Sequence, residues 1–285
     1  TQAFERYVIN FEDMTLEQAA AWPDLLEVVR QDVKPERDVS STAAFKKYWW
    51  RYANSRVGSF RELRKLQRCL VTARVTKHLC FSFQPTNRIF SEQLCVFMLP
   101  EWSHFAVLQS RVHEAWARLL SSSFGEGLRY SPSDCVGTFP FPTLEPSDVA
   151  PELEAIGEQL YRTRADLMER SGGGLTKLYN ALKDAGEQTP EIQALRELHQ
   201  EMDRRVLQAY GWGDLVVPAY ETQSEEGARF NDLVLDRLYV LNAERSRLAA
   251  NDQIPKGLKK TRGSSEQGVV ARPLAKTKRP SRKVL

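Results

Sequence analysis

The central part of the chain repeats its hydrophobic positions at the helical period. Leu108, Val112, Ala115, Trp116 and Leu119 recur at steps of three and four residues, which predicts an amphipathic helix. Three serines at 121–123 break the pattern, and the glycines at 125 and 127 predict a loop. Polar residues and the apolar run 138–142 follow this loop. A helix that leads into a polar loop holds a few side chains on a rigid support, which favours recognition over catalysis.

The remaining hydrophobic pattern predicts a mixed fold. Residues 4–11, 70–78, 81–83 and 94–99 are rich in aromatic and β-branched side chains, which is typical of strands. Thr15 and Gln18 form a capping-box pattern, with Thr15 as the N-cap of a helix that runs to about residue 21. Helical spacing predicts further helices at 24–33, 60–70, 151–170, 175–184, 190–210 and 228–250. We therefore expect an α+β protein with a mixed α/β domain over 1–143, an α-helical domain over 144–250, and a disordered basic tail over 251–285.

The net charge of +3 conceals a strong asymmetry along the chain. Residues 1–142 carry 18 basic and 15 acidic residues (net +3), 143–254 carry 12 and 21 (net −9), and 255–285 carry 10 and 1 (net +9). Residues 46–77 hold ten basic residues and a single acid, Glu62. A folded segment this basic beside an acidic one indicates a polyanionic partner on one face.

The cysteines do not have the spacing of a metal site. Cys69, Cys80, Cys95 and Cys135 include no Cys-x-x-Cys pair, so we expect buried, reduced thiols. No apolar run approaches the ~20 residues needed to cross a membrane, and we expect no membrane partner. The chain begins at Thr1 without a signal pattern, which fits a fragment of a longer protein.

Aromatic and cationic side chains alternate over residues 45–52, FKKYWWRY. Such a pattern serves a nucleic-acid surface by stacking and phosphate contact, and it equally serves a core whose cations reach outward. We expect Trp49 and Trp50 to be core residues and leave both interpretations open for the cations. The next segment, 60–70, predicts a basic amphipathic helix. The cations expected to contact DNA phosphates are Lys46, Lys47, Arg51, Arg61, Arg64, Lys65, Arg74 and Lys77.

Two runs resemble the target-recognition region of large adenine-specific DNA methyltransferases. They are Arg111 to Trp116, RVHEAW, and Arg129 to Pro142, RYSPSDCVGTFPFP, and the similarity extends from residue 5 to about 250. The resembled family is that of the fused Type IIL, or MmeI-like, restriction–modification enzymes, in which this region follows the catalytic domain and reads the DNA site. The resemblance implies double-stranded DNA as partner and a methyltransferase catalytic domain on the same polypeptide or as a split partner. It also implies a role in phage defence and a prokaryotic, cytoplasmic, nucleoid-associated protein.

The loop after the central helix is the predicted site of base recognition. Gly125 and Gly127 allow a close approach to a DNA groove. There Arg129 can bond guanine and Glu126 can accept from cytosine, and in the resembled family residue identity in this neighbourhood sets one base of the site. The alternative is that Arg129 pairs with Asp134 to brace the loop while Glu126 is solvated. Ser131 is the third candidate of this loop for base contact, and the resemblance adds His78, Arg111 and Tyr130 to the expected DNA contacts.

No catalytic motif accompanies these candidates. A methyltransferase of this kind needs a glycine-rich cofactor turn after a strand and an Asn-Pro-Pro-Tyr-like tetrapeptide, and the chain contains neither. We therefore expect no catalytic, cofactor-binding or metal-binding residue here, and S-adenosylmethionine is implied only for a catalytic domain outside this sequence.

Two functional hypotheses follow from the chain as a whole. The leading one is the DNA-recognition portion of an adenine-specific (N6) DNA methyltransferase or restriction–modification enzyme, inactive alone. The alternative is a protein-interaction subunit whose basic tail binds nucleic acid without sequence preference.

Overall fold

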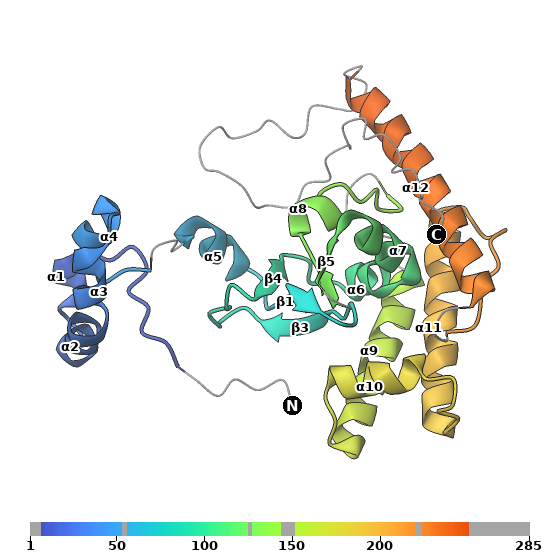
Figure 1. Cartoon of the computed structure of the whole chain (residues 1–285), viewed down its shortest axis with the longest axis horizontal. Helices are drawn as coiled ribbons and strands as arrows, with labels where there is room; N and C mark the ends of the chain where they lie inside the picture. The colour runs from blue at the N-terminus through green and yellow to red at the C-terminus, as the bar shows by residue number, and fades with distance from the viewer. Residues whose placement is uncertain (1–6, 53–55, 125–126, 144–151, 221–223, 251–285) are drawn as a thin grey trace. The chain divides into compact units, whose positions relative to one another are not determined.

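The computed structural model describes residues 7–52, 56–124, 127–143, 152–220 and 224–250. The chain divides into two compact units: unit 1 is Thr1–Gln67 with Thr86–Ile89, and unit 2 is Arg68–Pro85 with Phe90–Leu285 (Figure 1). With 57% of the described residues in helices and 9% in strands, the fold is mixed α+β, as predicted. The first residues of the predicted helical domain, 144–151, and the predicted tail at 251–285 lie outside the described residues.

Unit 1 is built from short helices. Thr15 caps the first of them through a capping box, because its hydroxyl accepts from the amide of Gln18 (3.2 Å) and its own amide donates to the Gln18 side chain (2.8 Å). This confirms the predicted helix start, although the helix ends earlier than expected. The helices are α1 (Leu16–Ala19), α2 (Pro23–Asp32), α3 (Lys34–Val39), α4 (Ala43–Lys47) and α5 (Val57–Leu63).

A small aromatic core holds the N-terminal helices together. Trp49 is only 7% exposed and packs with Phe11 and residues of α1 and α2, which confirms its predicted core position. Trp50 packs against this cluster, and its indole nitrogen donates to the carbonyl of Met14 at 2.9 Å. Arg51 donates to the same carbonyl at 2.9 Å. The aromatic half of the 45–52 segment therefore stabilises unit 1.

Two predicted elements of unit 1 have different bounds or a different structure. The described part of the predicted 4–11 strand, Tyr7 to Phe11, is irregular: Tyr7 is 89% exposed and Phe11 is buried at 4%. A strand needs a neighbouring strand for its backbone hydrogen bonds, and none of the described strands pairs with this segment. The predicted basic helix 60–70 ends at Leu63, because residues from Arg68 onward enter a sheet.

Unit 2 contains two small antiparallel sheets. The first has the order β3–β1–β4, formed by β1 (Arg68–Ala73), β3 (Ser82–Pro85) and β4 (Leu94–Phe97). The second has the order β2–β6–β5, formed by β2 (Val75–Thr76), β5 (Ser122–Phe124) and β6 (Gly127–Arg129). Arg74 joins the two sheets, since its amide donates to Gln93 in one direction (2.7 Å) and its carbonyl accepts from Tyr130 in the other (2.8 Å).

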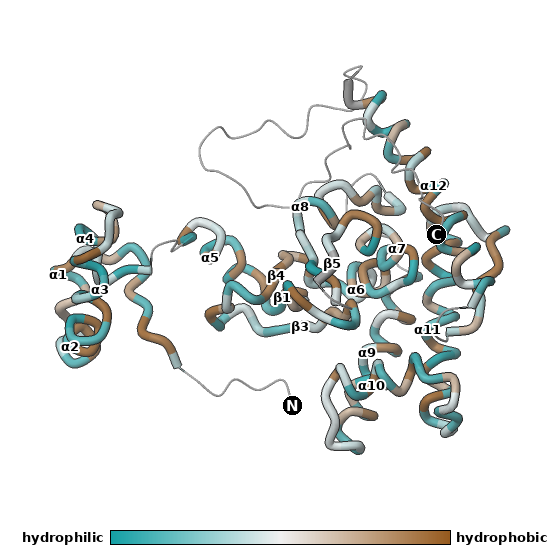
Figure 2. Tube along the Cα trace, viewed as in Figure 1, coloured by the Kyte–Doolittle hydropathy of each residue, from teal (hydrophilic) through white to brown (hydrophobic). Residues whose placement is uncertain are grey.

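Helices surround these sheets and share one hydrophobic core with them. Helix α6 packs on α9, α9 on α11, and α7 on α12. Phe230, Val234 and Leu238 bury one face of α12 at steps of four residues, and Figure 2 shows hydrophobic and hydrophilic positions alternating along that helix. The helices are α6 (Trp102–Gln109), α7 (Arg111–Leu120), α8 (Pro132–Cys135), α9 (Glu152–Ser171), α10 (Leu175–Lys183), α11 (Pro190–Ala209) and α12 (Glu225–Ala250).

The core of unit 2 continues across residue 143. Buried residues of the β-sheets and of α7 belong to the same cluster as Leu153, Leu195 and Leu238 of the later helices. The compositional change near residue 143 is therefore not accompanied by a break in packing among the described residues. Apart from Thr86–Ile89, the first compact unit ends at Gln67, and the domain boundary at residue 143 stays a prediction.

Candidate nucleic-acid interface

Helix α7 anchors the hairpin that carries the predicted base-reading residues. Ser110 caps the helix by accepting from the amide of His113 at 3.4 Å. The buried Trp116 donates through its indole nitrogen to Thr138 at 3.2 Å, and the carbonyl of Thr138 accepts from Asn242 on α12 at 2.5 Å. Strand β5 begins two residues after α7 ends, so the hairpin is attached to a helix fixed at several points.

Tyr130 lies inside this support and has no exposed surface. Its hydroxyl lies 2.9 Å from Nε2 of His113, which is also fully buried. Burial lowers the pKa of His113 to about 3 and raises the pKa of Tyr130 well above its ordinary value, so both groups are neutral at pH 7. Because the Tyr130 side chain has no exposed surface, it is not available to contact DNA in this structure, in contrast to the prediction.

Arg111 is held at the start of α7 by the chain itself. Its backbone amide and Nε donate to the carboxylate of Asp203 on α11 at 2.9 and 2.6 Å. Its terminal nitrogens donate to the carbonyls of Pro218 (2.8 Å) and Ala219 (3.0 Å). Burial raises the pKa of Asp203, and the Arg111 guanidinium and amide act against that shift. The guanidinium is thus committed to joining α7 to α11 and to the segment after it, so we assign Arg111 a bracing role.

The described end of the hairpin presents Arg129 and Ser131 at the surface. Arg129 is exposed and ends β6, where it lies opposite Val75 of β2 and Ser122 of β5. Within the described ranges it forms no ion pair, and the alternative pairing with Asp134 is not found. Ser131 is partly exposed and lies 3.0 Å from the hydroxyl of Ser133. The remaining base-contact candidate of this loop, Glu126, lies outside the described residues.

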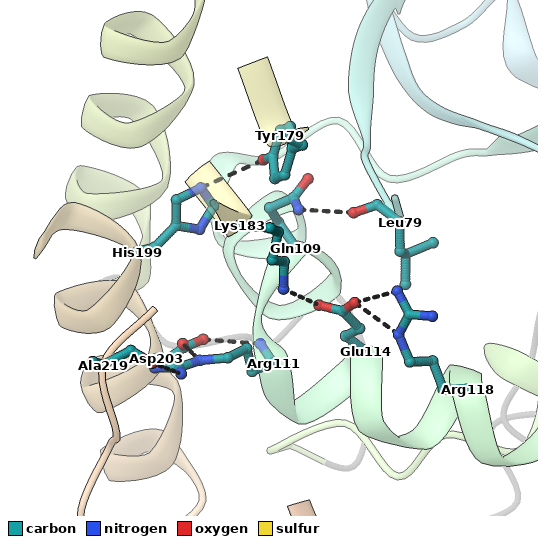
Figure 3. Close-up of polar contacts among 10 residues, drawn as sticks. All are labelled: Leu79, Gln109, Arg111, Glu114, Arg118, Tyr179, Lys183, His199, Asp203 and Ala219. Carbon is teal, nitrogen blue, oxygen red and sulfur yellow. Dashed lines mark hydrogen bonds and ion pairs between the residues drawn. The ribbon is translucent and has the colours of Figure 1, made fainter. Parts of the chain in front are cut away.

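A large groove opens in unit 2 beside α7. It encloses about 1150 Å³. Figure 3 shows Glu114 between two cations on its wall, Arg118 of α7 and Lys183 of α10. Glu114 accepts from Nε of Arg118 at 2.8 Å and lies 3.8 Å from the ammonium of Lys183. The groove is lined by Lys77, His78, Arg111, Glu114, Ala115, Arg118, Asn180, Lys183, Asp184, Ala219, Ser224, Glu225, Gly227, Ala228, Phe230 and Asn231.

Three predicted DNA contacts meet at this groove, although they come from two segments of the sequence. Lys77 is exposed there, and His78 and Arg111 line the same wall. The Nε2 of His78 donates to the Asn180 side chain at 2.8 Å. Burial lowers the pKa of His78, so the ring is neutral at pH 7.

Five of the predicted phosphate-binding cations of unit 1 fall into two groups. Lys46, Lys47 and Arg61 are exposed, and none of the three takes part in an ion pair within the part of unit 1 that is described. Arg64 pairs with Glu12, and Lys65 pairs with Glu62. Lys46, Lys47 and Arg61 are therefore free to bind phosphate. Arg64 and Lys65 must first release the glutamates with which they pair.

Two further predicted cations are partly held by backbone carbonyls. Arg51 donates to Met14 and also lies over the rings of Tyr48 (4.8 Å) and Trp50 (5.3 Å). Arg74 donates through Nε to the carbonyl of Glu92 at 3.0 Å. Both remain partly exposed, so a second contact to DNA stays a prediction for each.

The four cysteines are free, and three of them are buried: Cys69, Cys95 and Cys135. Burial raises the pKa of Cys69 and Cys95 to about 11 and that of Cys80 to about 12, so all three are neutral thiols at pH 7. Among the residues that the structure describes, no cluster of three His, Cys, Asp or Glu side chains is placed to hold a metal ion. In the same residues, no helix is both long and apolar enough to span a membrane.

Sequence reasoning did not identify three residues that line the groove, Glu114, Asn180 and Lys183, nor the Arg111 partner Asp203. The burial of Asp203 could have been predicted, because it lies one residue after Met202 and three before Val206, on the apolar face of α11. An acid at such a position needs a buried cation as partner. Asn180 and Lys183 gave no such signal, since their partners lie more than 65 residues away in the sequence.

Comparisons with known proteins bear on this site. The family model of the MmeI target recognition domain matches residues 1–143. No curated protein matches the chain. Among solved structures, the Type IIL restriction-modification enzyme MmeI in complex with DNA matches with a TM-score of 0.51 and 18% sequence identity, covering 82% of this chain. The match covers 28% of that enzyme's chain, and at this identity it shows a shared fold.

Proposed function

Since this chain belongs to the family of MmeI target recognition domains, we propose that it binds double-stranded DNA and selects the recognition site of an adenine-specific DNA methyltransferase or restriction–modification enzyme. In this proposal the methyltransferase catalytic domain lies outside this sequence, on the same polypeptide or on a split partner. A role in phage defence belongs to the same proposal.

The exposed position of Arg129 is the observation that most strongly supports this proposal. The guanidinium projects from the exposed end of β6, while the adjacent Tyr130 is buried against His113. An arginine on a rigid support can bond O6 and N7 of guanine together, the commonest specific contact in the major groove. Ser131 beside it adds a hydroxyl that both donates and accepts. This arrangement fits base recognition.

In this proposal, exposed cations bind the DNA phosphates, and these contacts do not depend on the base sequence. Lys46, Lys47 and Arg61 of unit 1 and Lys77 of unit 2 are exposed, and none forms an ion pair with another described residue. Contacts of lysine and arginine with phosphates fix the register of a protein on the duplex, and base contacts select the sequence. The proposed contacts thus divide between these cations and the hairpin.

S-adenosylmethionine does not fit the described residues. The strands of both sheets pair antiparallel, and none of the described strands leads through a glycine-rich turn into a helix, which is the arrangement that binds such cofactors. We propose that the methyl donor is bound by the catalytic domain. Calorimetric titration of the chain with S-adenosylmethionine tests this, and micromolar binding would contradict it.

Selection of bound oligonucleotides from a random pool tests the DNA-binding function itself. The proposal expects one enriched motif, retained over non-specific DNA at moderate salt. A protein-interaction subunit with a basic tail would enrich no motif, and its binding would disappear uniformly as salt rises. That second outcome would replace the proposed function.

A further inference from the structure

The groove of unit 2 joins the family-matched segment to the helices that follow it. Lys77, His78 and residues of α7 line the groove within the matched segment. Helix α10 lines it beside α7, through Asn180 and Lys183, which lie beyond residue 143, where the match to the family model ends. A partner bound in this groove therefore contacts both segments.

The size and lining of the groove favour an extended, charged partner. Its volume of about 1150 Å³ exceeds the ~300–1000 Å³ of ordinary small-molecule pockets. Such pockets are lined mostly by apolar and aromatic side chains. Seven of the described residues that line this groove are charged, and His78 and Phe230 are the two that carry an aromatic ring.

Glu114 fixes the positions of two cations on the wall. Its carboxylate is bonded by Arg118, which is 44% exposed, and lies near the ammonium of Lys183, which is 25% exposed. The nearby cations lower the pKa of Glu114 despite its burial, so the carboxylate is charged. Two cations share one carboxylate, which leaves a net positive charge at this point of the groove.

Lys183 is further restrained by an aromatic ring. Its ammonium lies 4.8 Å from the centre of Tyr220, a contact that orients the side chain along the groove wall. His78 on the facing segment is tied to Asn180 of α10, which brings the exposed Lys77 to the same groove. Lys77, Arg118 and Lys183 thus offer hydrogen-bond donors within one concave surface.

We propose that this groove receives the DNA backbone and that Lys183, on a helix outside the family-matched segment, makes a phosphate contact together with Lys77. This inference rests on the proposed function and extends it to the helices after residue 143. The acidic groups of the groove fit the assignment. The carboxylate of Asp184 already accepts from the amide of Gly186 at 2.9 Å. Glu225 lines the groove from α12. Phosphates are therefore expected beside α7 and α10, where the cations lie.

The test compares two lysines of the same helix. Lys183→Gln and Lys177→Gln each remove one charge from α10, but only Lys183 lines the groove; Lys177 is exposed elsewhere. DNA affinity of the full chain is measured across salt concentrations by fluorescence anisotropy. Each phosphate contact contributes about 0.9 to the slope of log affinity against log salt. Lys183→Gln is expected to reduce the slope by about that amount, Lys177→Gln to leave it unchanged, and Lys183→Arg to restore it.

A labelling experiment gives a second result that does not depend on a variant folding. An amine-reactive reagent modifies exposed lysines, and saturating duplex DNA is expected to protect Lys183 and Lys77 but not Lys177. If Lys77→Gln reduces the slope while Lys183→Gln does not, and Lys183 stays unprotected, the inference is wrong and the proposed function stands. If the chain binds no DNA, both are wrong.

Discussion

Asp203 and Arg111, separated by 92 positions in the sequence, form a buried ion pair that joins helix α11 to the first turn of helix α7. The carboxylate has no exposed surface, and it accepts from both the amide and the Nε of Arg111. The remaining guanidinium nitrogens donate to the carbonyls of Pro218 and Ala219. The helix that supports the proposed base-reading hairpin is therefore positioned by residues of the C-terminal half of the chain.

Removing one partner of this pair is expected to destabilise unit 2 strongly. Asp203→Ala leaves the guanidinium of Arg111 without its counter-charge, and breaking a buried pair costs about 3–5 kcal/mol. Glu201→Ala on the same helix is the matched control, because Glu201 pairs with Arg204 and Arg205 at the surface, where such pairs contribute below about 1 kcal/mol. Urea denaturation measures both. Equal losses for the two variants would show that the pair between Arg111 and Asp203 does not brace the fold.

Two helical glycines are expected to respond to alanine with opposite signs. A Cβ on Gly157 of α9 would fall on the carbonyl oxygen of Trp102, at the contact of α9 with α6, so Gly157→Ala should destabilise unit 2. A Cβ on Gly58 of α5 would meet open space, so Gly58→Ala should stabilise α5 by up to about 1 kcal/mol. Thermal melts of both variants test the difference. A neutral Gly157→Ala would mean that α6 and α9 can separate without loss.

Acidification is expected to destabilise unit 2 through its buried histidines. The folded pKa of His113 is about 3, lowered by burial, and burial also lowers the pKa of His199. An unfolded histidine titrates near ~6.5, so between these values the unfolded chain binds the extra proton. The stability contributed by neutral His113 is complete above pH ~6.5 and declines as the pH falls, by ~1.4 kcal/mol per unit. Urea titrations at pH 7 and pH 5.5 measure this loss. His113→Gln should show a shallower pH dependence, and an unchanged one would assign the loss to other groups.

The exposed cations of unit 1 are expected to differ from the braced ones in their effect on DNA binding. Arg61→Ala should weaken binding to all sequences about equally and make the salt slope shallower by roughly one unit. Arg51→Ala should instead lower the stability of unit 1, because Arg51 bonds the carbonyl of Met14. Anisotropy titrations over several salt concentrations separate these effects. Unchanged slopes for Lys46, Lys47 and Arg61 alike would mean that these charges face solvent in the complex.

Local signals in the sequence predicted most of the helices. The capping box of Thr15 and Gln18 marked the start of α1, and the left-handed Gly211 (φ 73°) follows α11 directly after the predicted helix range of 190–210. Both signals act within one helical turn, so they are readable without knowledge of the fold. The predicted helix from Leu108 to Leu119 missed one such signal. Ser110 has extended backbone angles and caps α7, and it therefore separates α6 from α7.

Features that depend on distant partners were not predictable in this way. The aromatic segment before α1 has the composition of a strand, but strand formation needs a partner that composition does not reveal. Arg111 was expected to contact DNA, yet its partner is Asp203, and no local pattern connects the two. Tyr130 follows directly after β6 and continues the alternation of that strand, in which Leu128 is buried and Arg129 is exposed. The resemblance located the recognition region, and only packing distinguished its supporting residues from its surface residues.

The sharpest prediction concerns the hairpin and its two charged candidates, Glu126 and Arg129. Glu126 lies outside the described residues, while Arg129 is exposed two residues after Gly127, which opens β6. A carboxylate is repelled by DNA phosphates, so a glutamate near DNA needs a base as its partner, and the cytosine amino group is the donor that suits it. Glu126→Lys replaces an acceptor by a donor. It should therefore change the preferred base pair at one position and weaken binding to the original site by about 1–3 kcal/mol.

Selection of binding sites from a random pool, repeated for the unmodified chain and for Glu126→Lys, measures this change directly. Arg129→Ala should relax the preference at one position and weaken non-specific binding less, because a base contact contributes mainly to discrimination. Lys177→Gln serves as the charge control, since Lys177 lies on α10, far along the chain from the hairpin. A base-reading role requires that the altered preference be confined to one position of the motif. The same motif for Glu126→Lys, with affinity changed equally for every sequence, would instead identify Glu126 as a surface charge that acts only through the overall potential.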